Sequence, residues 1–168
     1  HSHELCGCRY VDENFVLTLT NPSNATLARG TAQGQITNDP LPAFEEIAAG
    51  SFSIGRGYDP GAVLGDSGVL NSLEVRFGTL MPTRAETVAW QTYLFSDVAH
   101  VWNEDPSRRA ANPDRLWSAG AGVRFAWGQG LQGDFLVAAP LVRPDLALEK
   151  GDIRFLFTLT ARLLPWRF

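Results

Sequence analysis

Two groups of polar residues have the types and spacing that could do chemistry. Asp97 and His100 could form an acid–base pair, but a spacing of three places them on opposite faces of a strand. Two histidines and two cysteines near the start are ligand types that zinc accepts, but a Cys-x-Cys pair so early in a chain is a weak metal signal. These four residues are His1, His3, Cys6 and Cys8.

The sequence predicts no catalytic site, no metal site and no cofactor, and we do not expect an enzyme. It contains no nucleophile elbow, Walker motif or His-Glu-x-x-His motif. A disulfide between Cys6 and Cys8 would be strained. Residues 1–12 are interpreted as a leader that is disordered or comes from an expression vector. Residues 13–168 are interpreted as the transmembrane β-barrel portion.

The most informative segment is the glycine-rich stretch from Gly50 to Gly68, which carries one arginine, Arg56, near its start. A connection of this length is uncommon and usually has a function. Glycine permits positive φ and close backbone approach, so this loop can fold back on itself. The glycines are Gly50, Gly55, Gly57, Gly61, Gly65 and Gly68.

Composition excludes some classes of protein and leaves two open. The net charge of −4 does not suggest a nucleic-acid partner, and no run of 18 apolar residues indicates a transmembrane helix. Mean hydropathy is −0.08 and charged residues are 19% of the 168. Both a soluble domain and a transmembrane β-barrel, whose polar and apolar residues alternate, fit these values.

Alternation of period two recurs from about residue 13 onward and predicts about eight strands. Many are near the length of about 9–11 residues that crosses a membrane. After the glycine loop, long connections alternate with short ones, as in outer-membrane barrels. The predicted strand leading into that loop is 44–54, and the alternation after the loop covers 72–77. Tryptophans near strand ends suit an interfacial girdle: Trp102, Trp117, Trp127 and Trp166.

The last predicted strand, 153–168, alternates apolar and polar residues up to a slip beside Pro165. A bulge there would turn Trp166 and Phe168 toward the apolar side. A terminal Phe with an aromatic residue two positions earlier resembles the signal by which outer-membrane barrels are recognised for assembly. A chance terminal Phe is the alternative.

Several motifs, in order along residues 30–168, resemble the TpsB transporters of two-partner secretion, the FhaC/ShlB/HecB haemolysin secretion/activation family. The central match is Arg56-Gly57-Tyr58, similar to the V-R-G-Y or V-R-G-F loop signature shared with BamA-type relatives, with Gly55 in place of Val. Leu73-Glu-Val-Arg76 resembles an E-x-R strand, and Phe95-Ser-Asp97 an F-x-D-x-G motif whose last glycine is Ala99 here. Ser118-Ala-Gly-x-Gly122 fits the strand that follows.

The resemblance implies an all-β fold, an antiparallel transmembrane β-barrel, with this chain holding about the last eight of sixteen strands. It implies that Arg56 lies inside the barrel and pairs with Asp97, because a guanidinium can bind a carboxylate through two hydrogen bonds. The loop residues that it singles out are Gly55, Arg56, Gly57, Tyr58, Gly65 and Asp66. The expected lumen-facing residues include Glu74, Arg76, Arg124 and Asp134.

We therefore expect an outer-membrane pore that secretes or activates a large partner protein. Its partners would be that secreted protein, the barrel-assembly machinery acting through the C-terminal strand, and outer-membrane lipid, with no nucleic acid. The alternatives are a BamA-like assembly factor, a small eight-stranded barrel with a binding or structural role, and a soluble β-sandwich.

Overall fold

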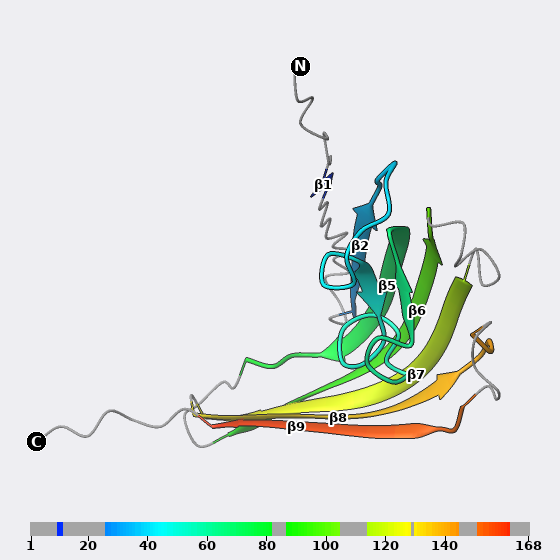
Figure 1. Ribbon diagram of the computed structural model, residues 1–168. Coiled ribbons are helices and arrows are strands. Elements are labelled where there is room, and N and C mark those ends of the chain that lie inside the picture. Colours follow the sequence, from blue (N-terminus) through cyan, green and yellow to red (C-terminus); the bar gives the residue numbers. More distant parts are fainter. Residues whose placement is uncertain are drawn as a thin grey trace, which may run out of the picture.

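The structure, a computed structural model, describes residues 10–11, 26–81, 87–104, 114–128, 130–144 and 151–161 (Figure 1). These residues form strands joined by turns and loops. The described ranges do not include Cys6, Cys8, Trp166, Phe168 or the first part of the alternation, from residue 13 to residue 25. The strands are β1 Tyr10–Val11, β2 Thr26–Gln35, β3 Ile47–Ala49, β4 Val63–Gly65, β5 Ser67–Gly78, β6 Val88–Trp102, β7 Asp114–Trp127, β8 Leu131–Pro140 and β9 Arg154–Ala161.

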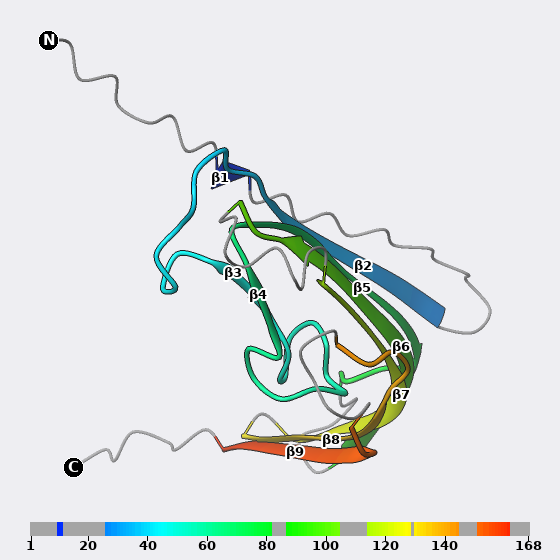
Figure 2. The ribbon, with the colours of Figure 1, turned by 45° about the vertical axis from the view of Figure 1, so that its right-hand side comes forward.

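Seven of these strands form one antiparallel sheet in the order β1-β2-β5-β6-β7-β8-β9. The sheet curves strongly and stays open, and the β3–β4 hairpin lies on its concave side (Figure 2). A sandwich would need a second sheet that covers this one, whereas among the described residues only a two-stranded hairpin packs on it. The fold is therefore a portion of a β-barrel wall with an inward-folded connection.

The period-two alternation separates the two faces of the wall as expected. In β6, Tyr93 and Asp97 point to the concave side and are buried, whereas Trp90 and Leu94 point outward and are exposed. Most outward positions of the other strands are also apolar, which suits contact with lipid, and Arg115 at the start of β7 is one exception. Exposed outward residues include Val69, Leu73, Phe77, Val98, Trp117, Trp127, Phe135, Phe155, Phe157 and Leu159.

Outward-facing tryptophans mark both ends of β7. Trp117 lies toward the long connections that follow β6 and β8, and Trp127 lies beside the short β7–β8 turn. Ten residues of strand span about 34 Å, which a tilt of about 40° reduces to about 26 Å along the membrane normal. This separation matches the height of the apolar band of an outer-membrane barrel. The described part of the chain contains no helix long and apolar enough to cross a bilayer.

The strand expected at residues 44–54 is shorter in the structure. It is β3, Ile47–Ala49, and it ends because Gly50 adopts a φ of +125° and turns the chain. A Cβ at Gly50 would lie 2.0 Å from the carbonyl oxygen of Asp59, so no other residue fits there. The partner strand β4 falls inside the stretch interpreted as loop, because a three-residue strand leaves too little alternation to detect.

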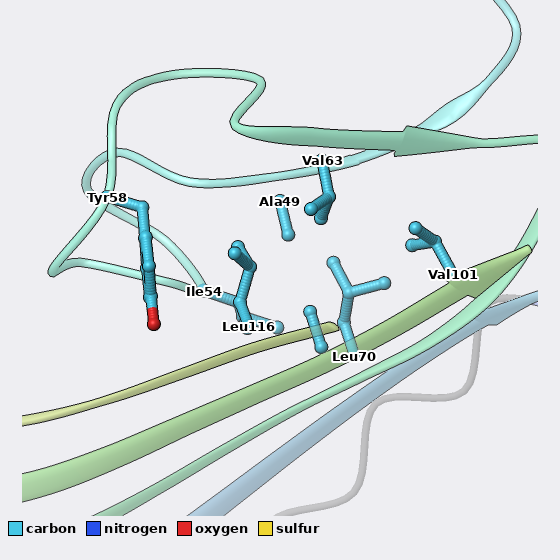
Figure 3. Close-up of a cluster of buried hydrophobic side chains, with 8 residues drawn as sticks. Ala49, Ile54, Tyr58, Val63, Leu70, Val101 and Leu116 are labelled. Atoms are coloured by element: carbon cyan, nitrogen blue, oxygen red, sulfur yellow. The ribbon is translucent and has the colours of Figure 1, made fainter. Parts of the chain in front are cut away.

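A hydrophobic core holds the hairpin against the inner wall of the sheet. Ala49, Ile54, Tyr58 and Val63 of the hairpin and its loop face the wall (Figure 3). They pack on the wall residues Leu70, Ala99, Val101 and Leu116. The long connection is thus a packed element of the barrel interior.

Candidate functional site: an arginine clamped to the inner wall

The tip of the loop, Gly55 to Tyr58, rests directly on the inner wall at β7 and β8. A Cβ at Gly57 would lie 2.8 Å from the Cβ of Ser118 and 2.9 Å from the backbone nitrogen of Pro140, so the contact requires glycine. The Tyr58 hydroxyl lies 2.7 Å from the carbonyl oxygen of Trp117 and accepts a 3.1 Å hydrogen bond from the backbone N–H of Val142. These contacts place Arg56 over the polar part of the wall.

Arg56 binds Asp97 through a two-point ion pair. Its Nε donates to Oδ2 of Asp97 at 2.9 Å, and its Nη2 donates to Oδ1 at 2.8 Å. The backbone N–H groups of Gly55 and Arg56 also donate to Oδ2, at 3.2 and 3.1 Å, and the Ser72 hydroxyl donates to Oδ1 at 2.7 Å. Asp97 is 0% exposed, so this buried carboxylate depends on the loop for most of its hydrogen bonds.

Glu74 joins Arg56 to a second ion pair farther along the wall. Its carboxylate accepts from Nη1 of Arg56 at 3.2 Å, from Arg76, and from both terminal nitrogens of Arg124. Arg124 in turn donates from Nε to Asp134 at 2.9 Å. The lumen-facing residues expected from the sequence thus form one connected network.

Two aromatic rings form a layer beneath the arginines. The guanidinium of Arg56 lies 3.6 Å from the centre of the Phe95 ring, and that of Arg124 lies 3.9 Å from the centre of the Tyr93 ring. Cation–π attraction of this kind is stronger where water is excluded. A Cβ at Gly120 would lie 2.6 Å from the Phe95 ring and one at Gly122 2.3 Å from the Tyr93 ring, so the glycines of β7 make room for both rings.

Sequence reasoning missed this layer, although a signal for it was present. Phe95 and Gly120 are direct cross-strand partners, and so are Tyr93 and Gly122. An aromatic residue opposite a glycine on the polar face of two adjacent strands indicates a ring lying flat across the neighbouring strand. Ser72 was also missed, because nothing in its spacing connects it to Asp97.

The charge of Arg56 is fixed by its surroundings. Burial alone would lower the pKa of the Arg56 guanidinium, but the hydrogen bonds and charges of Asp97 and then Glu74 raise this pKa above its ordinary value. The Arg56 guanidinium therefore stays protonated over the physiological pH range.

Asp66 has a separate role at the other end of the loop. Its side chain is 1% exposed and accepts hydrogen bonds from the backbone N–H groups of Leu41 and Glu104, both at 2.7 Å. Its own carbonyl oxygen accepts from Nε2 of Gln35 at 3.0 Å. Asp66 thereby holds together the chain before the hairpin and the chain after β6. A Cβ at Gly65, the residue before it, would lie 2.9 Å from the Cβ of Val101, so this close approach requires glycine.

Replacing Asp66 with alanine is expected to lower the free energy of unfolding by about 1–3 kcal/mol, because two backbone N–H groups lose their acceptor. Hydrogen exchange should accelerate at the amides of Leu41 and Glu104. Asp59→Ala is the matched control, because the Asp59 side chain is 85% exposed and its ion pair, with Arg154, involves neither amide. Unchanged exchange at both amides in the Asp66 variant would contradict this role.

In this site, buried opposite charges hold a long connection against the inner wall. Among the described residues, no group of three or more His, Cys, Asp or Glu side chains is placed to hold a metal ion. Asp97 and His100 lie on opposite faces, Asp97 buried and His100 exposed.

The Omp85 superfamily domain matches residues 10–159, nearly the whole chain. The chain belongs to the Omp85 superfamily, whose members are outer-membrane β-barrel proteins of secretion or assembly. This membership agrees with the curved antiparallel wall, its apolar outer face and its inward-folded loop. A search of curated proteins gives no match.

Proposed function

We propose that this chain forms part of the outer-membrane pore of a TpsB-type transporter, which secretes or activates a large partner protein by two-partner secretion. The observation that carries the proposal is the buried clamp between Arg56 and Asp97, which fixes a long loop inside the barrel wall. A pore that exports a polypeptide needs a hydrated, polar lumen and an element that can obstruct or guide it. The network around Glu74 supplies the polar surface, and the loop supplies the element.

In this mechanism, the clamped loop narrows the lumen at rest, and release or displacement of the loop accompanies passage of the partner. The proposed pore uses no nucleotide, no metal and no catalytic residue. Its proposed partners are the secreted protein, outer-membrane lipid on the apolar face, and the barrel-assembly machinery.

The experiment that tests this proposal compares export with assembly in cells that carry the intact protein with Arg56→Ala. We expect one secreted protein to disappear from the medium while the levels of other outer-membrane proteins stay constant. A general decline of outer-membrane proteins would instead assign the chain to BamA-like assembly. Arg143→Ala is the control, because Arg143 is exposed and contributes nothing to the clamp.

A further inference from the structure

A cavity of about 270 Å³ lies on the concave side of the wall, between β2, β5 and the turn that leads to the clamp. Its lining is mostly polar and includes Arg29, Gln33, Phe52, Glu74 and Arg76. Arg29 of β2 pairs directly with Glu74 of β5, and Leu27 pairs with Arg76. Arg29 and Arg76 are therefore diagonal neighbours on the two adjacent strands. This cavity lies beside the clamp and includes groups that the clamp does not use.

Two arginines of the cavity keep hydrogen-bond donors for a ligand. Arg76 donates from Nε to Glu74, and its two terminal nitrogens have no partner among the described residues. Arg29 is exposed and makes no hydrogen bond or ion pair within that part of the chain. Glu74 cannot satisfy them, because both of its oxygens already accept from Arg56, Arg76 or Arg124.

The charges around the cavity do not balance. The ion-pair network itself is neutral, because three arginines match the three carboxylates of Glu74, Asp97 and Asp134. Arg29 also lines the cavity and stands outside this network, which leaves one positive charge. Guanidinium groups with open donors bind carboxylates through paired, charge-assisted hydrogen bonds. The cavity therefore favours a carboxylate ligand.

Phe52 adds an apolar surface at the mouth of the cavity. Its side chain is 56% exposed, whereas that of Ile54, two residues farther along, is packed in the core. Ser51, the residue before it, has a φ of +79°, the one positive value for a non-glycine residue in the described chain. Such a conformation is unfavourable for serine and persists where the surroundings impose it. Here the hydrogen bond from the Ser51 N–H to the carbonyl oxygen of Tyr58, 3.1 Å long, holds the turn.

We propose that this cavity binds an acidic side chain of an extended polypeptide inside the lumen. Arg29 and Arg76 bind the carboxylate, and Phe52 contacts an apolar side chain next to it. The inference rests on the proposed function to the extent that a polypeptide must enter the lumen. It adds a preference for acidic segments, which the clamp itself does not give.

The test measures binding of labelled peptides to the intact protein in detergent by fluorescence anisotropy. One peptide repeats Glu-Phe-Ser, and a matched peptide has Gln in place of every Glu. We expect the acidic peptide to bind at least about tenfold more tightly, with a further loss of affinity at high salt. Arg29→Gln should weaken acidic-peptide binding about tenfold without changing thermal stability, because Arg29 has no partner to lose in the described chain. Phe52→Ala should weaken binding of both peptides.

The control is Arg115→Gln, an exposed arginine on the outward face of β7. Equal affinity for the two peptides, or an Arg29→Gln protein that is folded and binds the acidic peptide unchanged, would overturn the inference. Complete displacement by an equal concentration of inorganic phosphate would also overturn it, because the site would then be a general anion site. If peptide binding is absent but export is intact, the cavity proposal is wrong and the proposed function is unaffected. If peptide binding is present but the protein exports nothing, the proposed function is wrong and the cavity proposal is unaffected.

Discussion

Replacing Arg56 with alanine is expected to lower the free energy of unfolding by about 3–5 kcal/mol, because removing one partner of a buried ion pair leaves the other charge uncompensated. Asp97 is 0% exposed and takes two of its hydrogen bonds from the Arg56 side chain. Denaturant unfolding in detergent micelles measures the loss of stability. Limited proteolysis measures release of the loop, which should become cleavable between Gly50 and Gly68.

Two substitutions control this experiment. Arg143→Ala removes an exposed arginine and should leave both readings unchanged. Arg56→Lys keeps the charge but cannot present a planar two-point donor, so it should lie between the parent and the alanine variant. An Arg56→Ala protein with parental stability and a protected loop would show that the hydrophobic core beneath Tyr58 holds the loop without the ion pair.

Arginine at Val123 or Phe135 is expected to cost about 2–4 kcal/mol of folding free energy in a lipid bilayer. The two residues are cross-strand partners on the outer face, and Val123 lies near the midpoint between Trp117 and Trp127. A charged side chain there must leave water for hydrocarbon. Folding yield in vesicles, measured for each variant as a function of denaturant, gives the cost.

The matched control is Gln132→Arg, at an exposed position that alternates onto the concave face of β8. It should fold nearly as well as the parent, because that face is hydrated. Equal costs for Gln132→Arg and Phe135→Arg would contradict the assignment of the apolar face to lipid.

The sequence predicted the wall well because a strand repeats every two residues. The alternation of Trp90, Leu94 and Val98 with Tyr93 and Asp97 is enough to assign both faces of β6, and the structure has the same assignment. The contact between Arg56 and Asp97 could not be deduced from spacing, since 41 residues separate them. It was expected from the resemblance to a family, and the structure places the two side chains in contact.

Other parts of the site depend on strand register, which the pattern of one strand does not reveal. Glu74 and Arg124 face the lumen by alternation, but their contact requires β5 and β7 to bring them together across β6. The strand β3 was predicted too long, and its partner β4 was missed, because three residues leave too little alternation to detect. The backbone contacts of Asp66 were hidden because a carboxylate that binds N–H groups leaves no signature at its partners.

The most direct test of the clamp is a double-mutant cycle with Arg56→Ala, Asp97→Ala and the combined variant. The free energy of unfolding in micelles is measured for each protein. We expect the combined loss to be smaller than the sum of the single losses by about 1–3 kcal/mol, because both substitutions break the same contact. Losses that add within about 0.5 kcal/mol would show that Arg56 and Asp97 act independently and would contradict the clamp.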